Sequence, residues 1–254
     1  MTGRESRREP LDPPEPGLDV HSSVDAVREL YDRWSRVYDV NPVLGLVRPL
    51  RRRAVAAMGL APGDTVVDMG TGTGANLAFL REAVGPTGRV VGVDVSPGML
   101  AAARARVERA GWDNVALVEG DVRRPPLAGP VDGVLSAFVV VMYADPGPLL
   151  DAWADLVDGG VVANLYSGPS TRPSAPLVNR LLAGYLRLFE AGWDAGGDGP
   201  SPLDVVARRG RLARSALASR ATSAAHETGL LGLVQLDVGR FDGSTARSRR
   251  DDAG

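Results

Sequence analysis

The sequence contains no cysteine, which excludes disulfide bonds, thiolate nucleophiles and cysteine-based metal sites. It has only two histidines, His21 and His226, so a histidine-rich metal centre is excluded as well. Lysine and isoleucine are also absent, and all 29 basic residues are therefore arginine. Because both missing residues have A/T-rich codons, a GC-rich genome explains this bias, and the abundance of arginine by itself indicates no function.

Long apolar runs are missing too. No stretch approaches the roughly 20 residues that a membrane-spanning helix requires, and the N-terminus lacks the apolar core of a signal peptide. With a net charge of -2, the chain has no overall basic field of the kind that indicates nucleic-acid binding. We therefore expect a cytoplasmic protein with no nucleic-acid partner and no integral membrane segment.

The 254 residues suit one α/β domain with additions. Composition and apolar spacing predict where its parts begin and end, because the first 20 residues are rich in proline and charge and the next 40 have helical periodicity. The expected parts are a disordered tail (1–20), a helical cap (21–60), the main domain (61–240) with a helical insertion that covers the substrate (171–228), and a second disordered tail (241–254).

From residue 65 onward, short apolar runs alternate with amphipathic stretches, the pattern of a parallel sheet with helices on both faces. The expected strands are 65–68, 89–94, 115–119, 131–137, 161–166 and 230–238. The expected helices run from the glycine turn to 83 and over 97–110, 146–157, 177–190 and 202–228. Ser96 and Pro97 predict the start of one helix, with Ser96 as its N-cap, and Gly159-Gly160 predicts a turn before the fifth strand.

The first strand leads into the glycine-rich stretch VVDMGTGTG, residues 66–74. Glycines at 70, 72 and 74 let the backbone approach a ligand closely, and the free N–H groups of the following helix point toward that ligand. Such turns serve several nucleotide cofactors. Gly70-x-Gly72-x-x-Ala75 also fits the relaxed dinucleotide fingerprint, with Asp94 at the place of a ribose-binding acid, so a nicotinamide or flavin oxidoreductase is an alternative.

Four features favour a different cofactor: Asp68 two residues before the first glycine, the GxGxG spacing, Asp121 after the third strand in VEGDV, and a helical preface of about 60 residues. Together with VVGVDVSPGML, which covers the second strand and its acidic loop, they resemble class I S-adenosylmethionine-dependent methyltransferases over residues 24–170. The resemblance implies a Rossmann-like, doubly wound, mainly parallel seven-stranded sheet with an N-terminal helical cap. It also implies S-adenosylmethionine as cofactor.

The resemblance further implies a cofactor site built from the residues that match these motifs. They are Asp68, Gly70, Thr71, Gly72, Asp94, Val95, Met99, Asp121, Val122 and Ala137.

In that family, the glycine turn lies against the methionine part of the cofactor, and the acid in the place of Asp68 orients its ammonium group. Asp94 would accept hydrogen bonds from both ribose hydroxyls, a task that suits a carboxylate because it only accepts and can take two donors. Val95 and Met99 would flank the adenine, and Asp121 with Val122 would meet its amino edge. Plainer alternatives stay open: a turn acid for Asp94, a core side chain for Met99 and a surface residue for Asp121.

The segment YDRWSRVYD, residues 31–39, resembles the N-terminal segment of small-molecule methyltransferases that act on quinone precursors or phosphatidylethanolamine. In those families it folds over the cofactor, although a core-facing aromatic stripe is the plain alternative. Tyr38 and His226 are the predicted catalytic helpers, with Tyr143 as a further candidate, if the acceptor is a hydroxyl or an acidic carbon. For His226, a structural or surface position is the alternative.

The predicted reaction is methyl transfer to a small, apolar metabolite such as a quinol or lipid, by in-line displacement. The stretch SAFVVVMYADP departs from the Gly-Leu-Arg-Asn run of the quinone enzymes, so the acceptor stays open. A non-catalytic subunit that binds S-adenosylmethionine is the alternative from another class.

Two features bear on the surroundings of the site. Leu181, Leu182, Tyr185, Leu188 and Phe189 are predicted either to wall an apolar pocket or to pack in the core. The RPLRRR cluster, residues 48–53, is interpreted as a solvated helix face, with phosphate or an anionic membrane surface as alternatives. We expect a monomer or homodimer.

Overall fold

The computed structural model describes residues 28, 42–127, 129–173, 175–189 and 201–243. Several predictions concern parts of the chain outside these residues. They are the tail at 1–20, the part of the helical cap at 21–27 and 29–41, which includes Tyr38, and residues 244–254 of the second tail.

The described residues form a seven-stranded sheet in the order β3-β2-β1-β4-β5-β7-β6. The strands are β1 (Thr65–Met69), β2 (Arg89–Asp94), β3 (Val115–Glu119), β4 (Val131–Ala137), β5 (Val157–Ser167), β6 (Ser223–Gly229) and β7 (Val234–Arg240). Strands β1 to β5 pair in parallel, whereas β7 is antiparallel to both β5 and β6. The predicted mainly parallel, seven-stranded α/β fold is confirmed.

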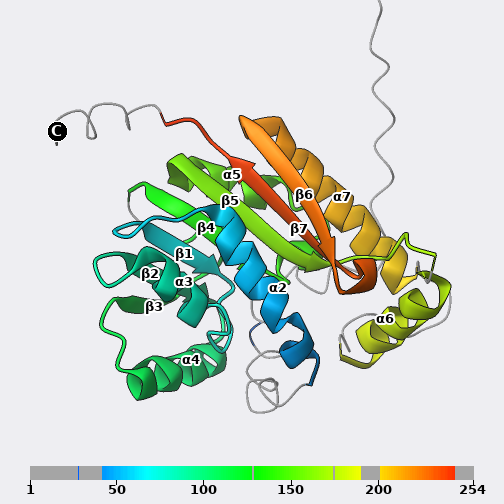
Figure 1. Cartoon of the computed structure of the whole chain (residues 1–254), viewed down its shortest axis with the longest axis horizontal. Coiled ribbons are helices and arrows are strands. Elements are labelled where there is room, and N and C mark those ends of the chain that lie inside the picture. Colours follow the sequence, from blue (N-terminus) through cyan, green and yellow to red (C-terminus); the bar gives the residue numbers. More distant parts are fainter. Residues whose placement is uncertain (1–27, 29–41, 128, 174, 190–200, 244–254) are drawn as a thin grey trace, which may run out of the picture.

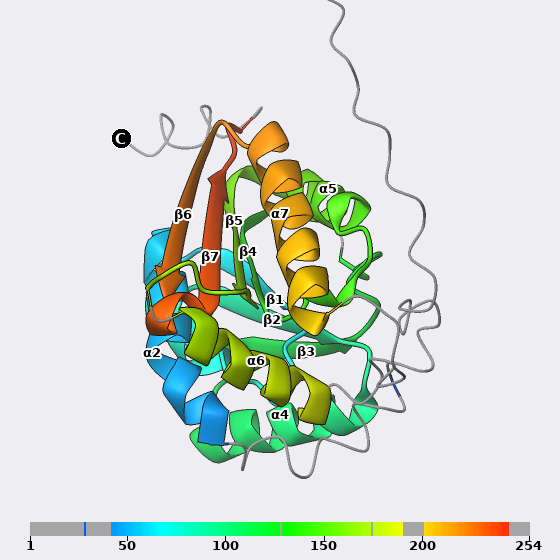
Figure 2. The ribbon, with the colours of Figure 1, turned by 90° about the vertical axis from the view of Figure 1, so that its right-hand side faces the viewer.

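Helices cover both faces of this sheet (Figures 1 and 2). The helices are α2 (Pro42–Met58), α3 (Leu77–Val84), α4 (Pro97–Ala110), α5 (Gly147–Leu156), α6 (Ala175–Phe189) and α7 (Pro202–Arg220), with short 3-10 turns η1 (Val140–Met142) and η2 (Leu230–Gly232). Figure 1 shows α2, α3 and α4 on the near face and α5 and α7 on the far face, while α6 lies at one end of the sheet. The doubly wound arrangement brings the carboxyl ends of β1, β2 and β4 together at one edge, where ligands bind in such folds.

Each face of the sheet has its own apolar core. Because neighbouring residues of a strand point to opposite faces, Val67 of β1 joins the core under α5 and α7, whereas Val66 joins the core under α2 and α3. Trp153 of α5 is fully buried, and its Nε1–H donates to the Val122 carbonyl over 2.8 Å. This bond ties α5 to the loop after β3, which belongs to the candidate site.

The prediction of one helix over 202–228 is wrong in its last part. Helix α7 ends at Arg220, and Ser223–Gly229 forms the edge strand β6, which pairs with β7. The sequence SAAHETG contains good helix formers, but the ladder with β7 outweighs this local preference. The predicted strand 230–238 accordingly begins later, at Val234, after the turn η2.

The predicted turn at Gly159-Gly160 is also wrong, since both glycines lie within β5. A Cβ on Gly160 would lie 2.3 Å from the Asp132 carbonyl oxygen, so glycine is required there by close contact with β4. The pairing of β4 and β5 shifts register beside these residues, between Val131 and Gly133.

Candidate functional site

The glycine turn after β1 is fixed to the neighbouring strand β2. The backbone N–H groups of Gly70 and Thr71 both donate to the Val93 carbonyl, over 2.8 and 2.9 Å. Gly70 has φ +70°, and a Cβ there would lie 2.4 Å from Val139 Cγ2. Glycine at 70 is therefore required by both backbone conformation and packing.

Gly72, in contrast, borders open space. Its φ is +55°, yet a Cβ placed on it would meet no heavy atom within 4 Å. Its N–H donates over 2.8 Å to Oδ2 of Asp94, at the end of β2. The turn thus leaves a space lined by backbone and bordered by a half-buried carboxylate, a combination that fits a ligand with hydroxyl or ammonium donors.

The Asp68 side chain holds the glycine turn in place through hydrogen bonds. Its side chain is completely buried, Oδ2 accepts a hydrogen bond from Thr71 Oγ1 over 2.7 Å, and Oδ1 accepts one from Asn76 Nδ2 over 2.8 Å. Burial raises the pKa of the Asp68 carboxyl, while the hydrogen bonds from Thr71 and Asn76 oppose that shift. Asp68 therefore joins the start of the turn to the start of α3, and each oxygen retains capacity for one further donor.

Arg51 of α2 extends this network and was missed by the sequence reasoning. Its Nη1 donates to Asn76 Oδ1 over 2.8 Å, and its guanidinium carbon lies 5.2 Å from the centroid of the Phe138 ring. The side chain is only 5% exposed, and its buried Nε has no hydrogen-bond partner among the described residues. A buried donor without a partner is costly, so this nitrogen points to a further acceptor at the site.

For Arg51, the interpretation of RPLRRR as a solvated helix face is therefore wrong. Arg51 lies four residues after the buried Val47 and four before the buried Val55, on the stripe of α2 that packs against the domain. That spacing was the available signal. Arg48, Arg52 and Arg53 are exposed, as interpreted.

Asp94 has both carboxylate oxygens directed at backbone N–H groups. Besides the bond from Gly72, its Oδ1 accepts one from the Ser96 N–H over 2.9 Å. The predicted N-cap is confirmed, because Ser96 Oγ accepts from the Met99 N–H over 3.1 Å. Met99 is 1% exposed and Val95 is half-buried, so the first turn of α4 gives this side of the site an apolar wall.

Asp121, beyond the end of β3, forms an ion pair with Arg123, whose Nη2 lies 2.7 Å from Oδ2. Desolvation alone would raise the pKa of Asp121, but the hydrogen bonds and charge of Arg123 outweigh it and lower that pKa. The carboxylate therefore stays charged at neutral pH. Val122, next to it, is buried, and the bond from Trp153 to its carbonyl fixes this loop.

The end of β4 also borders the candidate site. Ala137 is buried there, and Phe138 has a left-handed backbone with φ +65°, its N–H donating to the Leu165 carbonyl over 2.6 Å. Tyr143, after η1, is half-buried. Burial, with the negative charges of Asp121 and Asp94, raises the pKa of Tyr143 to about 12. Its phenol is thus a neutral donor at physiological pH, and its surroundings place it near both acids.

His226 lies apart from this group, in mid-strand on the edge strand β6. Its Nδ1 is 2.6 Å from Oδ1 of Asp237, the residue paired with it on β7. Tyr166 donates to the other oxygen of Asp237 over 2.5 Å, and Arg214 Nε lies 3.2 Å from Oδ1. Strands β7 and β5 separate β6 from β4, so the structure does not bring His226 to the glycine turn.

The predicted wall residues of α6 divide between two environments. Leu182 is buried and Tyr185 is half-buried against the core, whereas Leu181 is 65% exposed. Leu181 therefore does not pack in the core. For Leu188 and Phe189 only the helical backbone is described.

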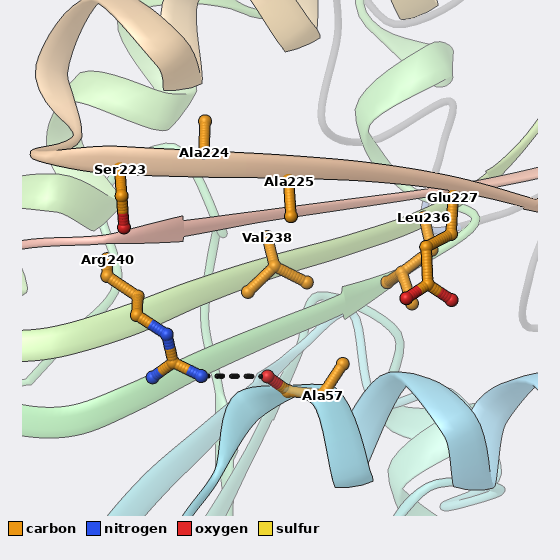
Figure 3. Close-up of a pocket in the computed structure, with 8 residues that line it drawn as sticks. All are labelled: Ala57, Ser223, Ala224, Ala225, Glu227, Leu236, Val238 and Arg240. Atoms are coloured by element: carbon orange, nitrogen blue, oxygen red, sulfur yellow. Dashed lines mark hydrogen bonds between the residues drawn. The ribbon is translucent and has the colours of Figure 1, made fainter.

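A separate pocket of about 390 Å³ lies between the end of α2 and strands β6 and β7 (Figure 3). Small and apolar side chains such as Ala57, Ala225 and Val238 line it. Arg240 at its rim donates to the Ala57 carbonyl over 3.1 Å and so satisfies the C-terminal end of α2. Its position away from the glycine turn makes it distinct from the site described above.

Two further properties concern the described residues only. No cluster of three or more histidine, aspartate or glutamate side chains in them could hold a metal ion. None of the helices in them is long and apolar enough to span a bilayer.

In a comparison with protein families, residues 66–160 match the family described as a methyltransferase domain. Aklanonic acid methyltransferase of Streptomyces sp. strain C5 is 33% identical over 135 residues, which cover 53% of this chain and 61% of the relative. Demethylmenaquinone methyltransferase of Symbiobacterium thermophilum is 36% identical over 141 residues, covering 53% and 56%. Nocamycin O-methyltransferase of Saccharothrix syringae is 32% identical over 148 residues, covering 57% and 51%. The chain thus matches between half and about three fifths of the length of these relatives.

Solved structures show the same fold at lower identity. A SAM-dependent methyltransferase from Aquifex aeolicus has a TM-score of 0.53 and 20% identity, over 74% of this chain and 88% of its own. Magnesium protoporphyrin IX methyltransferase from Synechocystis, solved with bound SAH, has a TM-score of 0.56 and 20% identity, over 86% and 99%.

Proposed function

We propose that the chain is a class I S-adenosylmethionine-dependent methyltransferase that transfers the methyl group of this cofactor to a small, apolar acceptor. Residues 66–160 match a methyltransferase domain, and the named relatives are methyltransferases. The observation that carries the proposal is the space beside Gly72, which would admit a ligand next to the Asp94 carboxylate. The names of the relatives support a small-molecule acceptor, since they refer to aklanonic acid, demethylmenaquinone and nocamycin.

The residues present fit S-adenosylmethionine in charge and in hydrogen-bonding capacity. We propose that Asp94 accepts from the ribose hydroxyls, that Val95 and Met99 flank the adenine, and that Asp121 with Val122 meets its amino edge. Carboxylates suit these places because they accept without donating. The part of the site that contains the Asp94 and Asp121 carboxylates is thus assigned to the adenosine half of the cofactor.

The methionine half would lie against the glycine turn and the end of β4. Gly70, Thr71, Gly72 and Ala137 would contact it through backbone and small side chains, and Asp68 would favour its ammonium group. We assign Arg51 to its carboxylate, because the guanidinium is buried beside the turn and has a donor, Nε, without a partner among the described residues.

The cofactor, when bound, supplies a methyl group that its sulfonium has already activated. The protein's task is then to hold the acceptor in line with that methyl group and to exclude water. Holding two reactants in a productive geometry contributes about 7–11 kcal/mol toward the barrier. Tyr143 stays protonated at neutral pH because its pKa is raised to about 12, so it serves as a hydrogen-bond donor that orients a group, and not as a base.

The decisive experiment measures cofactor affinity and turnover together in the full chain. Calorimetry with S-adenosylmethionine should show that Asp94→Ala loses about 1.5–3 kcal/mol of binding, the scale of hydrogen bonds to a charged group. Asp113→Ala is the matched control, since Asp113 is exposed in the loop before β3, away from the glycine turn. Unchanged affinity in Asp94→Ala would refute the site assignment.

Turnover is followed by transfer of isotope-labelled methyl groups into a metabolite extract. Label in an apolar small molecule supports the proposed reaction. Tight cofactor binding with no labelled product in any extract would favour the non-catalytic subunit instead.

A further inference from the structure

The outer rim beside α6 concentrates exposed apolar side chains. Five large apolar side chains are exposed among the described residues, and four of them belong to three elements at this end of the sheet. They are Leu46 of α2 at 61%, Leu177 and Leu181 of α6 at 67% and 65%, and Leu231 of η2 at 52%. Single exposed leucines are ordinary, but a group of them on adjacent elements indicates an interaction surface.

Contacts link both α2 and α6 to the neighbourhood of η2, so the elements that carry these leucines meet at one rim of the domain. Leu50, one turn after Leu46, packs against Gly229, the residue before η2. The Leu231 carbonyl accepts from Ser170 Oγ over 2.6 Å, and the Ser170 N–H donates to Asn179 Oδ1 of α6 over 2.7 Å. Figures 1 and 2 both show α2, η2 and α6 toward the same end of the sheet.

The backbone of η2 is strained, and this strained turn keeps the Leu231 side chain exposed. Leu230 and Leu231 have φ of +47° and +59°, in the left-handed region that non-glycine residues rarely adopt. Each such residue costs of order 1–2 kcal/mol, so the surrounding contacts must maintain the turn. The outcome is that Leu230 packs against the core while Leu231 stays half-exposed.

The two segments that carry Leu46, Leu177 and Leu181 contain arginine but no acidic residue. Segments 42–53 and 168–189 contain no aspartate or glutamate, although the whole chain has 31 acidic residues against 29 arginines. Arg48, Arg172 and Arg180 are exposed on the same elements or beside them. Exposed arginines around exposed leucines are the chemistry of an interfacial surface, which gains from buried apolar area and from attraction to anionic headgroups.

We propose that this rim, defined by Leu46, Leu177, Leu181 and Leu231 with Arg48, Arg172 and Arg180, docks on an anionic phospholipid bilayer. The arginines alone would equally suit a nucleic acid, but half- to two-thirds-exposed leucines gain nothing from a phosphate backbone. Membrane docking depends on the chemistry of this rim and not on the proposed methyl transfer, so either could fail in the experiment without the other.

The test is co-sedimentation of the full chain with vesicles of phosphatidylglycerol and phosphatidylcholine, compared with phosphatidylcholine alone. Binding is expected to the anionic vesicles and should weaken as salt rises from about 0.1 M to about 1 M, because screening shortens from about 10 Å to about 3 Å. No sedimentation with anionic vesicles at the lower salt would overturn the proposal, as would equal binding to neutral vesicles.

Two variants separate the apolar and the charged contributions. Leu177→Ser with Leu181→Ser should weaken vesicle binding at least about tenfold, since two leucines no longer enter the interface. Arg180→Gln should weaken it about fivefold, the effect of one basic residue near an anionic surface. The matched controls are Leu212→Ser and Arg211→Gln on the outer side of α7, which should bind vesicles as the parent does.

These variants should keep parent-like thermal unfolding and affinity for S-adenosylmethionine, because the altered side chains are exposed and lie outside the cofactor site. Vesicle binding that persists in the double leucine variant would overturn the proposed surface. A shift of the complex from vesicles to duplex DNA in competition would assign the arginines to nucleic acid instead.

Discussion

Asp68 and Arg51 have opposite charges and are both almost fully buried beside the same turn, yet they are joined through a neutral residue. Asn76 donates to Asp68 and accepts from Arg51, so neither charge is left without a hydrogen bond. Isolated buried charges are expensive, and such arrangements cluster at functional sites. The buried arginine thus complements the acid that the glycine motif brings with it.

The assignment of Arg51 to the cofactor carboxylate predicts a selective loss of affinity. Arg51→Met should weaken binding of S-adenosylmethionine at least about tenfold, because a charge-assisted hydrogen bond contributes about 1.5–3 kcal/mol. Binding of 5′-methylthioadenosine, which has no carboxylate, should change little. Calorimetry with both ligands measures the difference.

Arg52→Met is the control for this prediction, since Arg52 is the exposed neighbour on α2. An equal loss for both ligands in Arg51→Met would show that Arg51 acts only by holding Asn76 and the turn in place.

At the scale of the elements, a cluster of polar side chains lies between α7 and the strands β5, β6 and β7. Asp237 is 2% exposed and receives hydrogen bonds or charge from Tyr166, Arg214 and His226. Burial and the Asp237 carboxylate raise the pKa of Tyr166, so this phenol stays a donor. The group joins β5, β6, β7 and α7 and thereby fixes the edge of the sheet.

His226 should therefore stabilise the fold through its contact with Asp237. His226→Gln should lower the free energy of unfolding by about 1–3 kcal/mol, because a buried carboxylate loses one of its partners, and methyl transfer should continue at the parent rate. Chemical denaturation and the isotope assay measure the two effects. A lost methyl transfer activity with unchanged stability would instead assign His226 the catalytic role that the sequence suggested.

The control for this substitution is Thr228→Ala on the same strand. Thr228 is exposed, so its replacement should change stability by no more than about 0.5 kcal/mol.

At the scale of the whole molecule, the proposed cofactor site would join segments from α2, β1, β2, β3 and β4, so its occupation should stabilise the fold as a unit. S-adenosylmethionine at about 100 times its Kd should contribute about 2.7 kcal/mol. For a domain of this size each kcal/mol raises Tm by about 2–4 °C, so a shift of roughly 5–11 °C is expected by scanning calorimetry.

Asp94→Ala at the same cofactor concentration should show a much smaller shift, and NADH should produce none with the parent. A larger shift with NADH than with S-adenosylmethionine would restore the dinucleotide alternative.

The sequence alone determined most of the sheet and the motif at its centre. Strands β1 to β4 and the start of α4 were predictable because alternation, glycine turns and the Ser96 cap are local signals, written within a few residues. The acids Asp68, Asp94 and Asp121 were also proposed from sequence, since they lie at or just after the ends of strands at a spacing that resembles class I methyltransferases.

Only the tertiary structure decided the remainder. Residues 223–229 have a helix-like composition and became a strand because β7 offered a ladder, and Arg51 became part of the site because α2 packs with that side inward. Likewise, Leu46, Leu181 and Leu231 are far apart in the chain, and only the packing of α2, η2 and α6 collects them on one rim. Local patterns fix conformation over a few residues, whereas burial and the meeting of distant side chains depend on how the whole chain packs.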